Sequence, residues 1–162
     1  MRIISIVNND PVNSMTGYTL TIYFAGCSHK CPGCFSKNTW DYNAGKEYSV
    51  DEIKEIILKS RWKNITFLGG DPLYYENRDE VIKLIHFIKE NTDKNIYLWT
   101  GYLKEEVEKW IDASLIDYLI DGKFEIDKKD LRLKLRGSSN QRVFHNGVLM
   151  NKIGRASCRE RV

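Results

Sequence analysis

The sequence predicts an α/β fold with parallel strands that forms part of a (βα) barrel. Short apolar runs rich in β-branched and aromatic residues alternate with segments whose apolar residues recur at helical spacing. The connections have the length of crossovers, which favours parallel strands joined by right-handed connections. A closed eight-stranded barrel needs about 250 residues. A chain of 162 residues therefore forms only a portion of one.

The expected strands are short and apolar, and polar or glycine-containing turns separate them. In chain order they cover residues 3–7, 18–25, 65–68, 96–100 and 115–120. Three amphipathic helices are expected over residues 50–60, 77–91 and about 104–112. Ser49 and Glu52 form a capping-box pattern before the first helix, and Asn77 is the expected N-cap of the second.

Composition and charge place the chain among ordinary globular proteins. Hydrophobic residues make up 42% and charged residues 29%, and the formal net charge of +3 is too small to favour nucleic acid as a partner. No apolar run approaches the ~20 residues of a membrane span, and no signal-peptide pattern opens the chain. Clustered thiols at metal spacing fit a reducing compartment, so we expect a cytoplasmic protein without membrane association.

Residues 154–162 differ in character from the rest of the chain. They have no apolar periodicity, and they carry Arg155, Arg159 and Arg161 against Glu160, a net charge of +2. We therefore expect a single domain over residues 1–153 and an extraneous or disordered tail over residues 154–162.

Three of the four cysteines, Cys27, Cys31 and Cys34, stand on one predicted loop with the spacing C-x3-C-x2-C. Thiolates are the ligands of iron–sulfur clusters and of zinc. Three of them predict a [4Fe–4S] cluster in which one iron has no protein ligand and is open to a bound molecule. Cys158, in the expected tail, is not an expected ligand. The loop follows the strand 18–25, and α/β folds bind ligands at the carboxyl ends of their parallel strands.

A structural zinc site is the alternative interpretation of this loop, with His29 as the fourth ligand. Alternate residues of a tight loop seldom converge on one tetrahedral centre, and zinc knuckles usually pair C-x2-C with a second, distant pair. The spacing therefore favours iron and sulfide over zinc. His29 is expected to lie near the cluster or a partner protein and not to bind the metal.

The loop resembles the cluster motif of the radical S-adenosylmethionine (SAM) enzymes. Its text AGCSHKCPGCF, followed by Asn38, Thr39 and Trp40, resembles one branch in particular, the activating proteins of anaerobic (class III) ribonucleotide reductase. That branch has a glycine before the third cysteine, here Gly33, and an aromatic residue after it, here Phe35. The resemblance implies an open, partial (βα) barrel of the radical SAM type, with a [4Fe–4S] cluster and SAM as cofactors.

Further strings in the same order extend this resemblance over most of residues 10–145. GGDP at 69–72 resembles the family's loop for the SAM amino group, and WTGY at 99–102 and RGSSNQ at 136–141 resemble segments of the branch. The resemblance implies SAM contacts from Gly33, Cys34, Phe35, Gly69, Gly70 and Asp71. A β-branched side chain at Gly70 is therefore expected to weaken SAM binding and to leave the cluster in place.

The function that the resemblance implies is activation of anaerobic ribonucleotide reductase. In that family the reduced cluster cleaves SAM, and the 5′-deoxyadenosyl radical takes a hydrogen from a backbone glycine of the reductase's large subunit, which becomes a glycyl radical. The implied partners are this large subunit and a one-electron donor such as flavodoxin. No side chain is expected to act as a catalytic acid or base, and Asp117 and Asp121 are assigned to turns, solvent or the edge of the SAM site.

Three alternatives remain open: an activase of another glycyl radical enzyme such as pyruvate formate-lyase, a radical SAM enzyme for a small molecule, and a zinc-binding interaction module. Gly33 and the string 136–141 favour the reductase branch over the first. The short chain leaves little room for the substrate lid that the second would need. The basic stretch 123–142, with seven cations against three acids, is either a solvated face or a surface that meets the reductase.

Overall fold

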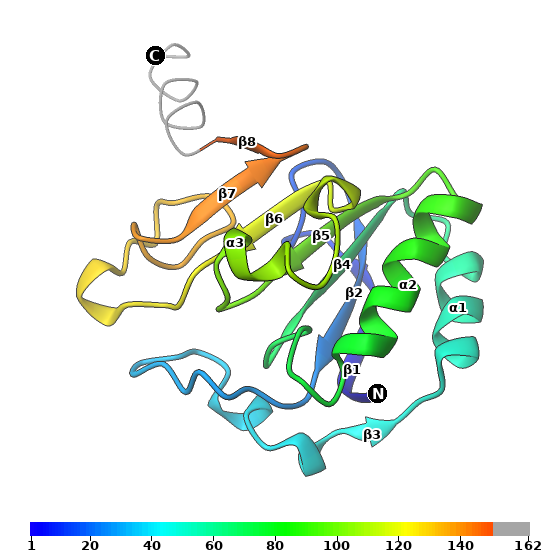
Figure 1. Cartoon of the computed structure of the whole chain (residues 1–162), viewed down its shortest axis with the longest axis horizontal. Coiled ribbons are helices and arrows are strands. Elements are labelled where there is room, and N and C mark those ends of the chain that lie inside the picture. Colours follow the sequence, from blue (N-terminus) through cyan, green and yellow to red (C-terminus); the bar gives the residue numbers. More distant parts are fainter. Residues whose placement is uncertain (151–162) are drawn as a thin grey trace.

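The computed structural model describes residues 1–150, which form a mixed α/β structure built on an eight-stranded sheet (Figure 1). The strands are β1 (Arg2–Asp10), β2 (Thr19–Phe24), β3 (Lys46–Glu47), β4 (Asn64–Gly69), β5 (Asn95–Trp99), β6 (Tyr118–Asp121), β7 (Arg142–His145) and β8 (Val148–Leu149). Their order across the sheet is β3-β1-β2-β4-β5-β6-β7-β8. The expected tail, with Cys158, lies outside the described residues, as does the expected domain end at 153.

The four central strands, β2, β4, β5 and β6, are parallel, as the alternation of strands and helices predicts. In their register Leu20 pairs with Ile65, and Ile65 pairs with Ile96. These side chains are fully buried, as expected for parallel strands that are covered on both faces. The carboxyl ends of the four strands therefore lie at one edge of the sheet.

The prediction of parallel strands is wrong for the outer parts of the sheet. β1 pairs antiparallel with β2 and β3, and β7 pairs antiparallel with β6 and β8. A short segment, 11–18, joins β1 to β2 without a helix, so the chain cannot cross over to a parallel position. β1 is longer than the expected 3–7, and β3, β7 and β8 were not predicted because each is only two to four residues long.

Three α-helices connect the parallel strands: α1 (Val50–Lys59), α2 (Arg78–Asn91) and α3 (Lys104–Val107). The predicted capping box at α1 is confirmed, since Ser49 Oγ accepts the N–H of Glu52 while the Glu52 carboxylate accepts the N–H of Ser49. α1 and α2 lie side by side (Figure 1). Their buried faces carry apolar residues at helical spacing, namely Ile53, Ile57, Val81, Leu84, Ile85 and Ile88.

Four short 3-10 helices complete the secondary structure of the described residues. They are η1 (Lys37–Thr39), η2 (Tyr42–Ala44), η3 (Ala113–Leu115) and η4 (Ile126–Lys128). The first two lie between the cysteine loop and α1, where a loop is expected. Within residues 1–150 no helix has both the length and the apolar character needed to cross a membrane.

Two helix predictions need correction. Asn77 precedes α2 but makes no side-chain cap. Its amide instead donates to the carbonyl of Ala25 (2.8 Å) and its side-chain oxygen accepts the N–H of Arg2 (3.0 Å), which ties the start of α2 to the sheet. α3 is shorter than the expected 104–112 because two backbone N–H groups just beyond Val107 bond three residues back, which tightens the helix into turns.

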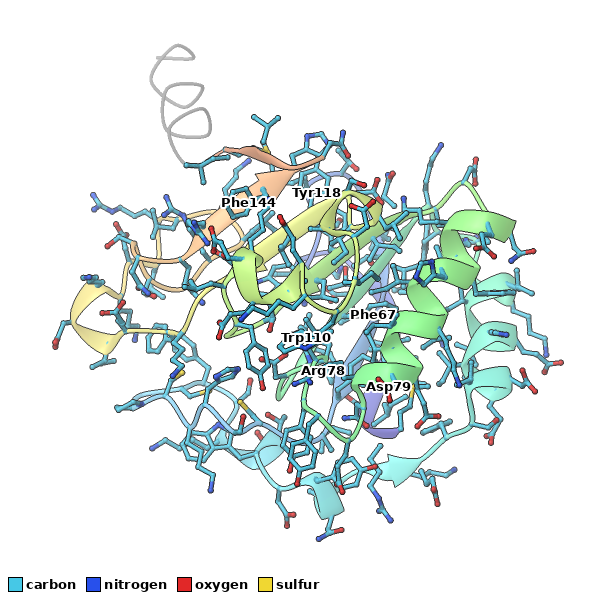
Figure 2. All side chains as sticks on the ribbon, viewed as in Figure 1. Phe67, Arg78, Asp79, Trp110, Tyr118 and Phe144 are labelled. Carbon is cyan, nitrogen blue, oxygen red and sulfur yellow. The ribbon has the colours of Figure 1, made fainter. Side chains whose placement is uncertain are left out.

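The start of α2 packs on the turn that follows α3. The Arg78 guanidinium lies 3.7 Å from the centroid of the Trp110 ring (Figure 2), a cation–π arrangement. Its Nε donates to the carbonyl of Leu73 (3.0 Å), and its Nη2 lies 3.4 Å from the Tyr102 hydroxyl. Arg78 therefore connects the loops that follow β4 and β5.

Candidate functional site

Three loops meet at the edge where the parallel strands end. The first follows β2 and carries the cysteines, the second follows β4 and contains GGDP, and the third follows β5 and contains the string 99–102. Backbone hydrogen bonds join the first two loops: the N–H of Gly70 donates to the carbonyl of Phe24, and the N–H of Asp71 donates to the carbonyl of Gly26, both at 2.8 Å. Strings from distant parts of the sequence therefore lie side by side.

The cysteine loop is anchored at its base. The N–H of Gly26 donates to the carbonyl of Thr39 (2.7 Å), and Gly26 has a φ of +103°, a left-handed conformation that favours glycine. Cys27, directly after it, is buried with 9% exposed, whereas Cys31 and Cys34 are half-buried. All three are free thiols.

Burial and neighbouring charges change the pKa values of thiols in the cysteine loop. Burial, and then the charge of Asp71, raises the pKa of Cys27 to about 11. Burial also raises the pKa of Cys31, the charge of Cys34 raises it further, and the charge of Cys31 in turn acts on Cys27. Cys31 is thus electrostatically linked to both Cys27 and Cys34. Within residues 1–150 no three His, Cys, Asp or Glu side chains are grouped closely enough to ligate one metal ion.

Asp71 is a buried junction of the three loops, with its side chain 1% exposed. Its Oδ2 lies 2.7 Å from His29 Nε2 and accepts hydrogen bonds from Thr100 Oγ1 (3.0 Å) and the N–H of Gly101 (2.9 Å). Its Oδ1 accepts the N–H of Leu73 (2.9 Å). Both carboxylate oxygens of the residue expected to meet the SAM amino group are therefore already bonded within the protein.

Gly69 and Gly70 touch backbone atoms, so neither position has room for a side chain. A Cβ at Gly69, whose φ is +115°, would lie 2.4 Å from the backbone nitrogen of Phe24. A Cβ at Gly70 would lie 2.5 Å from the carbonyl oxygen of Gly26 and 2.8 Å from that of Thr39. Since these two carbonyls belong to the base of the cysteine loop, a side chain at Gly70 would displace that base.

The other expected SAM residues, Gly33, Cys34 and Phe35, lie at the outer part of the cysteine loop. Phe35 is 67% exposed, and its ring centroid is 5.5 Å from that of Phe124. A Cβ at Gly33, whose φ is +77°, would lie 2.6 Å from the side chain of Ile126. The six expected residues therefore fall into two groups, one beside the base of the loop and one against the segment that follows β6.

The string 136–141 folds into a turn beside the ends of β5 and β6. Gln141 accepts two backbone N–H groups of this turn (2.8 and 3.2 Å) and donates to the carbonyl of Gly122 (2.9 Å). Trp99 Nε1 donates to the carbonyl of Leu135, just before the string. This hydrogen bond joins the string 99–102 to the residue directly before the string 136–141.

Asp117 and Asp121 connect elements of the fold. Asp121 is fully buried and pairs with Arg142, whose Nε lies 3.0 Å from Oδ1. Asp117 pairs with Lys89 and accepts the N–H of Ile96 (2.7 Å). Asp121 therefore ties β7 to β6, and Asp117 ties α2 to β5. Both acids have a structural role, which the assignment to turns or solvent did not include.

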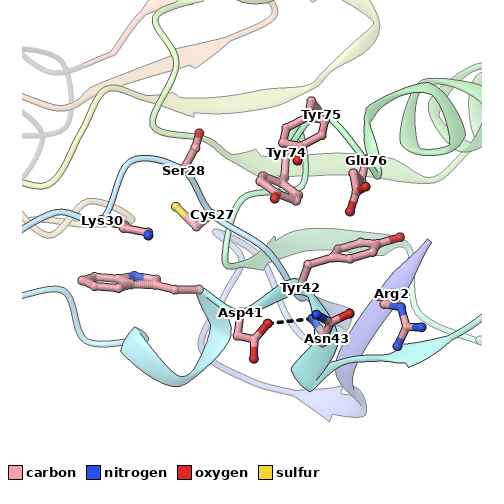
Figure 3. Close-up of a pocket in the computed structure, with 11 residues that line it drawn as sticks. Arg2, Cys27, Ser28, Lys30, Asp41, Tyr42, Asn43, Tyr74, Tyr75 and Glu76 are labelled. Carbon is pink, nitrogen blue, oxygen red and sulfur yellow. Dashed lines mark hydrogen bonds between the residues drawn. The ribbon is translucent and has the colours of Figure 1, made fainter.

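An open cavity of about 890 Å³ adjoins Cys27 (Figure 3). Its wall combines polar and charged residues with four aromatic side chains, those of Trp40, Tyr42, Tyr74 and Tyr75. Trp40 Nε1 is buried and makes no hydrogen bond within the described residues. In the sequence Trp40 stands out only as part of a motif, and no pattern there marked the three tyrosines as site residues. The position of Tyr74 and Tyr75, directly after Leu73 and the string GGDP, is the signal that could have identified these two residues.

Comparison with known proteins agrees with these features. Residues 15–144 match a family described as a 4Fe-4S single cluster domain. Three similar proteins are each named anaerobic ribonucleoside-triphosphate reductase-activating protein. The protein of Enterobacteria phage T4 is 37% identical over 134 residues, 80% of this chain and 85% of the relative. That of Escherichia coli K12 is 40% identical over 137 residues, 80% and 89% of the two chains. That of Vibrio cholerae is 37% identical over 150 residues, 86% and 94%.

Proposed function

The chain belongs to the family of anaerobic ribonucleoside-triphosphate reductase-activating proteins, and from this premise we propose that it generates a glycyl radical on the large subunit of such a reductase. The observation that carries the proposal is the placement of three free thiols on a loop at the carboxyl ends of parallel strands, the usual ligand edge of α/β folds. The family match as a 4Fe-4S domain supports the same chemistry.

In this proposal Cys27, Cys31 and Cys34 hold a [4Fe–4S] cluster and leave one iron without a protein ligand. When bound, the cluster would supply the electron for reductive cleavage of SAM, and the hydrogen taken up by the adenosyl group would come from a glycine of the reductase. The protein's part is to bind and orient. The burial of Cys27 keeps solvent from one side of the site, and the thiols must lose their protons before they bind iron.

The SAM contacts are proposed from both groups of residues. Gly69 and Gly70 bring bare backbone to the base of the cysteine loop, and Gly33, Cys34 and Phe35 border its outer part. Asp71 follows Gly70, but its carboxylate is bonded to the protein. We therefore assign Asp71 to holding the loop and the backbone around it to meeting the ligand.

The overall form of the domain is proposed to be the open, partial (βα) barrel of the radical SAM enzymes, built on the four parallel strands. An open side suits a substrate that is itself a protein. The proposed partners are the reductase's large subunit and a one-electron donor such as flavodoxin. Three cysteines kept as free thiols fit a reducing compartment, so we place the protein in the cytoplasm.

The zinc-binding module receives less support from the geometry. His29, the candidate fourth ligand, points its Nε2 at Asp71, so it is engaged outside the set of cysteines. Anaerobic reconstitution with iron and sulfide separates the two interpretations. A brown protein with iron and sulfide bound is expected, and a colourless protein that takes up zinc alone would support the module.

Electron paramagnetic resonance (EPR) tests the proposed partner. Reconstituted protein, a reductant and SAM are mixed in parallel with the large subunit of anaerobic ribonucleotide reductase and with pyruvate formate-lyase. A glycyl radical signal is expected with the reductase and not with the formate-lyase, and omission of SAM should abolish it. A signal with the formate-lyase alone would replace the proposal with the other activase.

A further inference from the structure

The cysteine loop and the SAM loop are joined by one buried pair of side chains. His29 stands between Cys27 and Cys31, and its Nε2 lies 2.7 Å from Asp71 Oδ2. The two side chains are only 8% and 1% exposed. A hydrogen bond between a histidine and a carboxylate is among the stronger kinds in proteins, and burial increases its strength.

The third loop is shaped to receive the same histidine. A Cβ at Gly101 would lie 2.4 Å from Cδ2 of His29 and 2.7 Å from its Nε2, although the φ of Gly101 is not in the left-handed region. The glycine is therefore required by the imidazole ring and not by its own backbone. The ring also meets Tyr102 edge to face, with centroids 4.5 Å apart.

We propose that His29 is a positioning residue that couples the cluster-binding loop to the SAM-binding loop. The inference rests on the proposed function and adds a role for a residue outside the proposed iron ligands and SAM contacts. Because Asp71 directly follows Gly70 and shares its Oδ2 among His29, Thr100 and Gly101, the histidine fixes the loops after β4 and β5 relative to the cysteines. Residues behind a ligand commonly set its orientation in this way.

Two substitutions at position 29 separate the hydrogen bond from the ring contact. The terminal amide of glutamine reaches about as far as Nε2, so His29→Gln keeps a donor for Asp71. His29→Phe keeps the ring against Tyr102 and removes the donor. Gly101→Ala is an independent route to the same perturbation, since its methyl group displaces the imidazole. His86→Gln, at an exposed position on α2, is the matched control.

The measurements are iron and sulfide per chain, and the dissociation constant for radiolabelled SAM by equilibrium dialysis of reconstituted protein. His29→Phe and Gly101→Ala should keep their iron and bind SAM roughly tenfold more weakly, in the range typical of coupling between sites. His29→Gln and the His86→Gln control should bind SAM as the unchanged protein does. In a double-mutant cycle, His29→Phe with Asp71→Asn should lose little more affinity than either change alone.

The outcomes distinguish this inference from the proposed function. Equal SAM affinity in His29→Phe and the unchanged protein, or additive losses in the cycle, would overturn the coupling and leave the proposed function intact. Loss of iron from His29→Phe would make His29 part of cluster assembly and would also overturn it. If the unchanged protein holds a cluster but binds no SAM, the proposed function itself fails.

Discussion

Gly70→Ala should destabilise the whole protein and not only its SAM site. The added Cβ would lie 2.5 Å from the carbonyl oxygen of Gly26 and 2.8 Å from that of Thr39. Both obstacles are backbone, so no rotamer change relieves the overlap. The same carbonyls accept the N–H groups of Asp71 and Gly26 at 2.8 and 2.7 Å, and a shift large enough to admit a methyl group weakens both bonds.

The magnitude follows from these contacts. Overpacking costs about 1–3 kcal/mol, and two weakened hydrogen bonds add about 0.5–1.5 kcal/mol each. Replacing glycine recovers about 0.4–1 kcal/mol from the unfolded chain. The expected net loss in the free energy of unfolding is therefore about 3 kcal/mol. Gly17→Ala is the control, because Gly17 has open space and only its φ of +70° opposes a side chain, at a net cost of about 1 kcal/mol.

Urea unfolding followed by circular dichroism, under anaerobic reducing conditions, measures both losses. Iron content after reconstitution is measured on the same samples, and Gly70→Ala should hold less iron because Gly26 directly precedes Cys27. A Gly70→Ala protein that is as stable as Gly17→Ala and retains full iron would refute the packing argument. It would restore the narrower expectation that Gly70 serves SAM alone.

Two further predictions concern the thiols. Cys27→Ala, Cys31→Ala and Cys34→Ala should each lose most of their iron and sulfide on reconstitution, while Cys158→Ala keeps both, and a reversed pattern would disprove the ligand assignment. In metal-free protein, burial and the charge of Asp71 raise the pKa of Cys27 to about 11, so its alkylation by iodoacetamide, followed by mass spectrometry, should still be accelerating above the ordinary thiol pKa of about 8.5. Because the folded state holds this proton more tightly than the unfolded chain, metal-free protein should lose stability as the pH rises from about 8.5 to about 11. An alkylation midpoint near the ordinary thiol pKa would contradict the burial of Cys27.

Local patterns in the sequence predict the centre of the fold well. The capping box at Ser49 and Glu52 and the apolar stripes of α1 and α2 depend on residues three or four apart, and the structure has them as expected. The parallel central strands follow from the alternation of apolar runs with helices. These features are encoded by neighbours in the chain.

Features that depend on distant residues could not be predicted in the same way. Asn77 has the residue type of an N-cap, yet its side chain bonds to Arg2 and Ala25, which lie far from it in the sequence. β7 is too short to have a clear period, and it pairs with β6 only after a long excursion of the chain. Tertiary contacts decide such cases over local propensity.

The loops of the candidate site could be predicted from the sequence, but the side-chain contacts between these loops could not. The cysteine spacing and GGDP predict two loops of one site, and the parallel strands explain why those loops lie together. The bonding of Asp71 to His29, Thr100 and Gly101 has no signature in the sequence, because His29 comes from the cysteine loop and the other two come from the loop after β5, both distant from Asp71 in the chain. The requirement for glycine at position 101 likewise becomes clear only once the imidazole is placed beside it.

Transfer of an isotope tests the central claim most directly. The glycine of the reductase's large subunit that becomes the radical is deuterated at its α-carbon, and the protein, with its cluster reconstituted, is supplied with SAM and a reductant. Deuterium should appear in 5′-deoxyadenosine in step with the glycyl radical signal, and neither should appear with Cys27→Ala, Cys31→Ala or Cys34→Ala. Formation of the radical without deuterium in 5′-deoxyadenosine would contradict direct hydrogen transfer from the glycine.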